Sequence, residues 1–162
     1  MRKRILGVLA AAAAFAGVVA ATTTPASTAA PAAVSASTTT STTDTGWITQ
    51  EEVHSSTNTA VAVDKVTPAG TVQVRHGIHA GKQHGWGRAV NPTADYNLIF
   101  EVDLNGDRRP EKQWTWSYLP EGGLRWTGGY PTSSSSDRAF RACITRHSSC
   151  SKTTSDYRTA WW

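Results

Sequence analysis

The chain has 162 residues, of which 16 are Lys or Arg and 12 are Asp or Glu, giving a formal net charge of +4. Three of these cations are Arg2, Lys3 and Arg4, and the rest of the chain carries 13 basic against 12 acidic residues, a net charge of +1. This balance excludes the strongly basic surface typical of nucleic-acid or anionic-membrane binding, and we expect no nucleic-acid partner.

Residues 1–21 have the pattern of a secretory signal peptide. The three cations precede an apolar run from Ile5 to Ala21, which ends in small residues suited to cleavage near Ala20 or Ala21. The run is short for a membrane-spanning helix, which needs about 20 apolar residues. We therefore expect a secreted, extracellular protein that keeps no membrane segment after cleavage.

Residues 22–45 consist almost entirely of Thr, Ala, Ser and Pro, with Asp44 as their only charge. A segment of this composition has too little apolar bulk to offset the entropy of ordering, so we expect a disordered linker. It would serve as a spacer, a glycosylated stalk or an arm that orders on a partner.

The remaining residues, 46–162, are expected to form one β domain. Apolar and polar side chains alternate with a period of two, and turn residues separate the runs, which is typical of a small antiparallel β-sandwich or barrel. The predicted strands are 60–66, 71–75, 81–90, 96–102, 112–118, 124–130 and 138–146. The last of these would also suit one face of a helix, and we favour a strand because its neighbours are strands.

Two features are expected to stabilise this all-β domain. Cys143 and Cys150 are the only cysteines, and an exported chain enters an oxidising space, so we predict one disulfide between them. Leu, Ile, Val and Phe make up only 18 of the 117 residues from Gly46 to Trp162, whereas all seven tryptophans lie there. Because each buried indole covers roughly 150–250 Å², the core is predicted to depend on tryptophan.

The sharpest motif lies between residues 103 and 111. It places side chains with oxygen ligands at every second position, Asp103, Asn105 and Asp107, and a further one at Glu111. Over nine residues this pattern resembles the D-x-N-x-D calcium loops of the EF-hand, dockerin and FG-GAP families. Calcium is the only cofactor that the sequence suggests. The motif departs from those families at Arg108, where glycine is usual, and the adjacent cations oppose a dication. The alternative is a tight hairpin with its Asn-Gly step as a type I′ turn.

The stretch from residue 76 to residue 88 is the second candidate site. It carries His76, His79, His84, Trp86 and Arg88 among four glycines. Three histidines suit zinc or copper, but their spacing matches no established site and no cysteine or acidic ligand lies nearby. The glycines indicate a turning backbone, so we interpret the stretch as a recognition loop in which tryptophan and arginine anchor a partner.

No catalytic residues are predicted. The chain lacks a G-x-S-x-G elbow, an H-E-x-x-H pair and a Gly-rich phosphate loop, and its cysteines are expected to be oxidised. We therefore expect a protein that is not an enzyme. Trp114 and Trp116 share one face of a predicted strand, and a row of exposed indoles would stack on sugar rings, which makes carbohydrate binding the main alternative to protein binding.

Five segments resemble small secreted β-domain proteins of actinobacteria. They are VQVRHG at 72–77, GWGRA at 85–89, FEVD at 100–103, RAFRAC at 138–143 and the closing WW at 161–162. Together they are spread over nearly the whole folded part. The resemblance implies export and a β fold, and it implies no activity.

Actinobacteria also export small non-catalytic β proteins that act as adaptors, for example in extracellular toxin particles. By analogy of class, we expect a non-enzymatic interaction protein, an adaptor or accessory subunit of an extracellular complex, whose partner is a secreted or cell-surface protein. One alternative is a carbohydrate- or cell-wall-binding module, with or without calcium. Another is a secreted protease inhibitor that would use the loop at 131–136.

Overall fold

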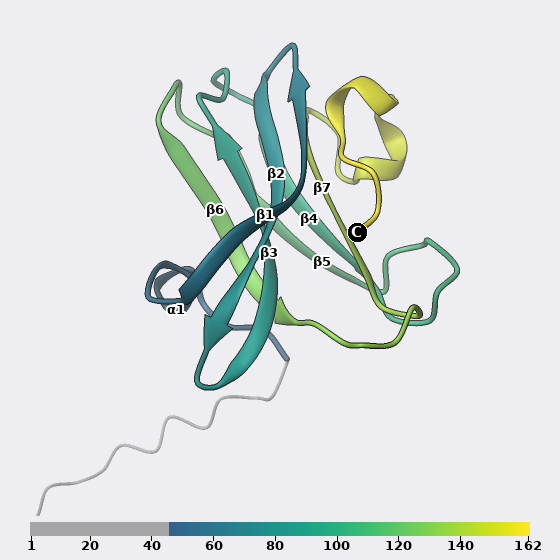
Figure 1. The fold of residues 1–162 in the computed structure, drawn as a ribbon. Helices are drawn as coiled ribbons and strands as arrows, with labels where there is room; N and C mark the ends of the chain where they lie inside the picture. Colours follow the sequence, from purple (N-terminus) through teal and green to yellow (C-terminus); the bar gives the residue numbers. More distant parts are fainter. Residues whose placement is uncertain (1–45) are drawn as a thin grey trace, which may run out of the picture. The chain divides into compact units, whose positions relative to one another are not determined.

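The computed structural model describes residues 46–162, and the predicted signal peptide and linker, 1–21 and 22–45, lie outside this range. The described residues form two antiparallel β-sheets with one short helix and two 3₁₀ turns (Figure 1). The elements are α1 (Gln50–His54), β1 (Thr57–Thr67), β2 (Gly70–His79), β3 (Lys82–Val90), β4 (Asn97–Asp103), β5 (Lys112–Trp116), β6 (Leu124–Pro131), β7 (Ala139–Thr145), η1 (Cys150–Lys152) and η2 (Ser155–Tyr157). The predicted all-β fold is confirmed, in the form of a sandwich.

The first sheet has four strands in the order β1-β2-β3-β6, and every pair is antiparallel. β1 and β2 are joined at Pro68-Ala69, where the Thr67 hydroxyl accepts the Ala69 N–H at 3.1 Å. β2 and β3 are joined at Ala80-Gly81, whose φ angles of 48° and 75° are both positive, as a type I′ turn requires. Both connections are tight hairpins, so strands that follow one another along the chain lie side by side.

The second sheet has three strands in the order β5-β4-β7, and β7 confirms that residues 138–146 contain a strand and not a helix. The C-terminal residues extend this sheet. Trp162 exchanges two backbone hydrogen bonds of 2.9 Å with Phe140, and the Thr159 N–H donates to the Ala142 carbonyl at 2.9 Å. The C-terminal segment therefore covers the edge of β7 that β4 leaves unpaired.

The hydrophobic core lies between the two sheets. Leu98, Phe100 and Val102 of β4 all point into it, as the alternation predicts, and Phe100 stacks on Phe140 with 5.5 Å between ring centroids. Gly87 of β3 allows the sheets to approach closely, because a Cβ at this position would lie only 3.2 Å from the Cβ of Phe100. The core thus unites side chains from both sheets into one cluster.

Tryptophan packs around the core and not at its centre. Among residues 46–162, Trp86 is the one tryptophan that is fully buried, with 3% exposure, and it lies on the outer face of the four-stranded sheet. Trp47, Trp114 and Trp116 pack half-buried against the core. The prediction of an indole-dependent core is therefore wrong for its centre, where aliphatic and phenylalanine side chains interdigitate.

The disulfide loop covers the outer face of the three-stranded sheet. The predicted Cys143–Cys150 disulfide is formed, with 5.6 Å between the two Cα atoms. Beneath this loop the buried carboxylate of Glu101 accepts the Arg141 Nε–H at 3.0 Å and the Cys150 N–H at 2.8 Å. The Arg141 guanidinium also lies 4.3 Å from the centre of the Trp161 ring.

None of the helices that the structure describes is long and apolar enough to cross a membrane. The disulfide fits an extracellular protein, because such bonds persist in oxidising compartments.

Candidate functional site

Residues 76–88, interpreted as a recognition loop, form regular strands, of which only the part within 81–90 is also a predicted strand. β2 runs to His79, a two-residue turn follows, and the rest of the stretch is β3, paired with β2 residue by residue. Strand residues alternate between faces, so this stretch sends its side chains to two opposite sides of the sheet. The glycines that suggested a loop permit close packing: a Cβ on Gly77 would lie 2.9 Å from the Trp86 ring.

The three histidines of this stretch do not form one cluster. His76 pairs with Gly85 within the sheet, and its ring stacks on Trp162, the last residue of the chain, at 5.3 Å. His84 is buried, which lowers its pKa below the ordinary value, and its Nδ1 lies 3.0 Å from a backbone carbonyl. His79 Nε2 lies 3.5 Å from the Glu52 carboxylate. Within residues 46–162 these side chains do not gather into a group of potential metal ligands.

The helix α1, which the sequence-based prediction lacks, lies against β6. It begins with a capping box, in which Thr49 Oγ1 accepts the Glu52 N–H at 3.2 Å and the Glu52 carboxylate accepts the Thr49 N–H at 2.7 Å. The indole of Trp126 donates to the Gln50 carbonyl at 3.0 Å and stacks on His54 at 5.2 Å. The Thr-x-x-Glu spacing is the sequence signal that reveals the start of this helix.

A groove of about 280 Å³ opens on the outer face of the four-stranded sheet, beside α1. It is lined by α1 and by all four strands of the sheet, through Val53, His54, Thr59, Arg75, Trp86, Arg88, Leu124 and Trp126. Of the five binding residues predicted from the sequence, Trp86 and Arg88 line this groove and the three histidines do not. Arg75 lies directly opposite Trp86 in the register of β2 and β3, so strand alternation is the signal that would have found it.

Two half-buried arginines, Arg75 and Arg88, give the groove its charge. Arg75 Nη2 donates to the Thr59 hydroxyl at 3.1 Å, and Arg88 Nε donates to the Gln73 side-chain oxygen at 2.8 Å. Within residues 46–162 neither arginine belongs to an ion pair, and the groove lining contains no Asp or Glu. Burial lowers the pKa of both guanidinium groups, and the charge of Arg75 further lowers the pKa of Arg88.

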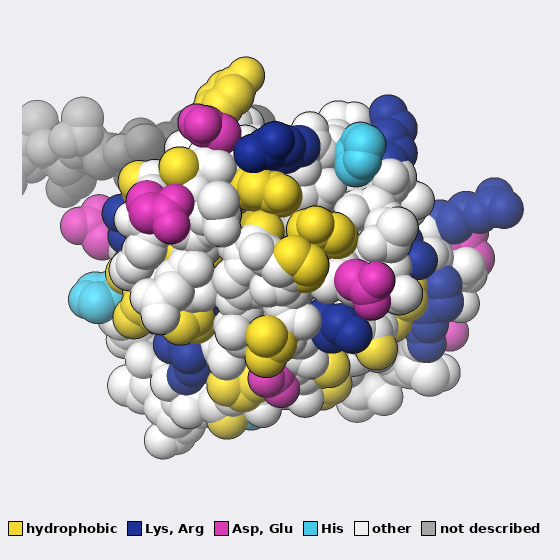
Figure 2. Space-filling model, turned by 90° about the horizontal axis from the view of Figure 1, so that it is seen from above, with side chains coloured by type: hydrophobic (Ala, Val, Ile, Leu, Met, Phe, Trp, Pro, Cys, Tyr) yellow, Lys and Arg dark blue, Asp and Glu magenta, His cyan; other side chains and the backbone are white. Residues whose placement is uncertain are grey.

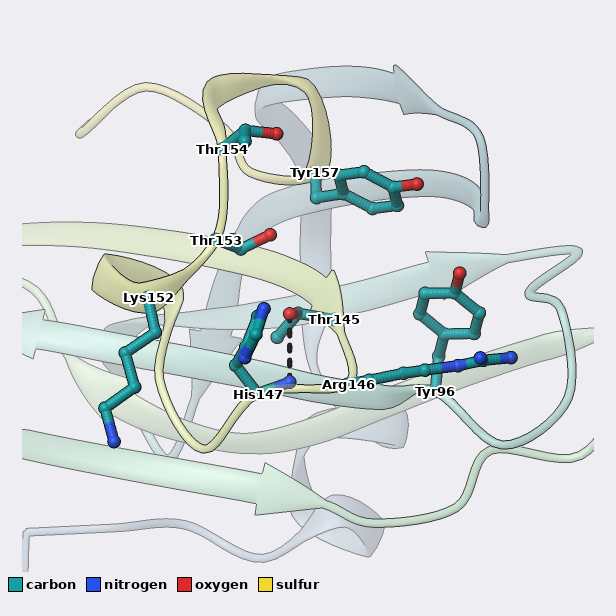
Figure 3. A pocket seen from close by; sticks show the side chains of 8 residues that line it. All are labelled: Tyr96, Thr145, Arg146, His147, Lys152, Thr153, Thr154 and Tyr157. Atoms are coloured by element: carbon teal, nitrogen blue, oxygen red, sulfur yellow. Dashed lines mark hydrogen bonds between the residues drawn. The ribbon is translucent and has the colours of Figure 1, made fainter.

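A second cavity, of about 270 Å³, lies where β7 ends beside the C-terminal turns (Figure 3). The Arg146 guanidinium lies 4.5 Å from the centre of the Tyr96 ring, and Tyr96 stacks on Tyr157 at 6.3 Å. Burial and the neighbouring Tyr96 raise the pKa of Tyr157. Figure 3 shows Lys152 pointing away from the two tyrosines. Since Arg146 and Lys152 are both exposed, water solvates the charges of this cavity more fully than those of the groove.

The end of the molecule that holds the β1–β2 turn mixes its charges: Figure 2 views this end, and cationic, anionic and apolar side chains are interspersed across it. The groove differs from this face because its lining within residues 46–162 has cations and no anions.

The loop between β4 and β5 is organised by Asp103, and the predicted Asn105-Gly106 type I′ turn is wrong. Such a turn needs two positive φ angles, but only Gly106 of the pair has one. The Asp103 carboxylate accepts the backbone N–H groups of Asn105, Gly106 and Arg108 at 3.0, 2.7 and 2.8 Å. Burial acts to raise the pKa of Asp103, but these bonds and the Arg108 guanidinium at 2.9 Å lower it overall.

The predicted calcium ligands come together in this loop. Asp103, Asp107 and Glu111 each place a carboxylate oxygen within 4.8 Å of the others. Glu111 accepts the Leu104 N–H at 2.6 Å and the side-chain amide of Asn105 at 3.0 Å, and a guanidinium already neutralises Asp103. Hydrogen bonds and this ion pair therefore hold the loop in shape, and calcium binding there stays a hypothesis that these contacts do not test.

Comparison of the chain with protein-family models, with curated proteins and with solved structures finds no match. The structural class of the protein is therefore described from its own fold and groove. It is an antiparallel β-sandwich with one disulfide and an arginine-lined groove on the outer face of its larger sheet.

Proposed function

We propose that the chain is a secreted, non-enzymatic interaction protein, an adaptor or accessory subunit, whose partner protein docks on the outer face of the four-stranded sheet. The observation that carries this proposal is the pair of half-buried arginines, Arg75 and Arg88, in a groove where residues 46–162 offer them no acidic partner. Removing guanidinium groups from water costs free energy, and an anionic group of a partner would offset that cost. Arginine and tryptophan also dominate the binding energy of protein interfaces.

The apolar part of the groove supports the same proposal. Leu124 of β6 lines it with 46% exposure, and Val61 of β1, the strand at the opposite edge of the same sheet, is 43% exposed. The lining that the described residues provide holds one histidine and no carboxylate, thiol or lysine, a composition that suits recognition better than acid–base or nucleophilic chemistry. Arginine and aromatic residues are enriched in protein interfaces, and the groove combines both with exposed aliphatic side chains.

The aromatic side chains of the groove give less support to the carbohydrate alternative. Sugar stacking needs an open aromatic face, but His54 stacks on Trp126, and Trp86 is only 3% exposed. Tyr118 has an open ring, with 78% exposure, but it lies outside the groove.

The test is a capture experiment from the culture supernatant of the source organism, with the exported protein as bait. Wild-type bait should retain a stoichiometric partner, which the charge-reversed variants Arg75→Glu and Arg88→Glu should lose. Arg109→Glu makes the same charge change at an exposed position in the β4–β5 loop and should retain the partner. Equal capture by all four baits, or no stoichiometric partner with wild type, contradicts the proposal.

A further inference from the structure

The register of the larger sheet makes Arg75 and Arg88 neighbours on one face. Arg75 of β2 lies opposite Trp86, and Arg88 of β3 lies opposite Gln73, so the two arginines are diagonal cross-strand neighbours. Cα atoms in such a diagonal pair lie roughly 7–8 Å apart, within reach of long side chains. The two like charges are close enough that Arg75 lowers the pKa of Arg88. A single anion between them would therefore contact both guanidinium groups.

The partners of these arginines leave most of their donors for a ligand. Within residues 46–162 each guanidinium makes one side-chain hydrogen bond, to Thr59 or to Gln73, and both acceptors are neutral. These bonds hold the side chains in place without cancelling their charge. A positioned and partly desolvated guanidinium binds planar anions more strongly than one that is free in water, because less entropy is lost and the charge is less screened.

The wall next to the arginines is apolar. Val53 of α1 and Leu124 of β6 line it together with the rings of His54 and Trp126. The volume of about 280 Å³ suits a side chain and its neighbour, and is too small for a folded element. A ligand that fills the groove therefore combines one small anionic group with an apolar group beside it.

From this geometry we infer that the groove recognises a carboxylate with an adjacent aliphatic group, as an Asp or Glu side chain next to Leu, Ile or Val on the partner protein presents. The inference rests on the proposed function, and it adds the chemistry of the contact. Arg75 and Arg88 receive the carboxylate, and Leu124, Val53 and Trp126 contact the aliphatic group. Among unmodified protein groups the carboxylate is the one anion that guanidinium groups bind with planar, paired hydrogen bonds.

The probe for this inference is N-acetyl-leucinate, which carries a carboxylate and an isobutyl group, and its matched control is N-acetyl-leucinamide, in which a neutral amide replaces the carboxylate. We expect the acid, at millimolar concentration, to shift the ¹⁵N-detected NMR signals of the Trp126 indole and of Arg75 and Arg88 Nε–H. The amide should bind about tenfold more weakly, because it lacks the charge-assisted hydrogen bonds. Raising the salt concentration should weaken the binding of the acid only.

Three variants locate the effect. Arg88→Gln removes the charge and should weaken binding of the acid about tenfold. Arg88→Lys keeps the charge but loses the paired N–H donors of the guanidinium, so its affinity for the acid should lie between those of Arg88→Gln and wild type. Arg109→Gln removes a charge of the same type from the exposed β4–β5 loop and should bind like wild type. The melting temperature of each variant shows whether the domain is intact, since Arg88 also contributes a hydrogen bond to Gln73.

Several outcomes overturn the inference. They are equal binding of acid and amide, unchanged affinity in Arg88→Gln, absence of any shift with the acid, and tighter binding of inorganic phosphate, which would assign the groove to a phosphorylated ligand. If the acid fails while Arg75→Glu and Arg88→Glu still lose the captured partner, the proposed function stands with another chemistry. If the acid binds but Arg75→Glu and Arg88→Glu capture the partner as well as wild type does, the groove recognises carboxylates but the proposed function is wrong.

Discussion

Glu101 and Arg141 form an ion pair that is closed off from solvent beneath the disulfide loop. The Glu101 side chain is 0% exposed and the Arg141 side chain is 8% exposed. Besides Arg141, the carboxylate accepts the Cys150 N–H at 2.8 Å, and the guanidinium also donates to Ser151 Oγ at 3.0 Å and faces Trp161. The substitution Glu101→Gln keeps the shape and one acceptor oxygen but removes the negative charge.

The expected cost of Glu101→Gln is large because it leaves Arg141 buried with its charge uncompensated. Removing one partner of a buried ion pair costs about 3–5 kcal/mol of unfolding free energy. Replacing both partners with apolar residues costs less, so the double variant Glu101→Leu with Arg141→Met should lose only about 1–3 kcal/mol, mainly for the unsatisfied Cys150 N–H. The double variant is therefore expected to be more stable than the single one.

Urea unfolding followed by tryptophan fluorescence measures both changes. The control is Asp64→Asn, which removes a carboxylate from an exposed position of β1 and should change the unfolding free energy by less than about 0.5 kcal/mol. If Glu101→Gln costs less than about 1 kcal/mol, or if the double variant loses the sum of the two single losses, the ion pair is not desolvated as its burial implies.

Further predictions concern pH, the disulfide and calcium. The pKa of Asp103 is lowered in the folded state, so its contribution to stability is present above the ordinary value of 3.8 and is lost as the pH falls through the lowered pKa; Asp103→Asn should flatten the acid limb of a melting-temperature profile. The pKa of His84 is also lowered, so acidification below its ordinary value of 6.5 should destabilise wild type but not His84→Gln. Reduction of Cys143–Cys150, whose sequence separation is 7, should lower the unfolding free energy by about 2.5 kcal/mol, measured by urea unfolding with and without reductant. Calcium at about 1 mM should leave the melting temperature unchanged, because Arg108 already neutralises Asp103; a rise that Asp107→Asn abolishes would show instead that the loop binds calcium.

Local signals predicted the strands because period-two alternation and turn residues are properties of neighbouring positions. All seven strands of the described range overlap predicted segments, although β2 continues to His79, beyond the predicted end at Arg75, and the disulfide follows from the presence of two cysteines. α1 was missed because a five-residue helix is too short for a 3.6-residue periodicity to show, although its capping box is visible in the sequence. The type I′ turn was assigned to Asn-Gly but forms at Ala80-Gly81, since the strand register and not the dipeptide decides where a hairpin reverses.

Local residue patterns are sufficient to predict an all-β domain with one disulfide, and they place Trp86 and Arg88 among the binding candidates. Which side chains share a surface depends on how distant segments pack. Arg75 lies near Arg88 because of the register of β2 and β3. Trp126 and His54 stack on each other although they belong to a strand and a helix that are far apart along the chain. Strand alternation directs His76 to one face of the sheet, whereas the rings of His79 and His84 meet on the other face with 6.2 Å between their centres. Contacts between distant segments depend on sheet pairing, which local residue patterns do not encode. Because the groove is built from such contacts, local patterns could not predict it.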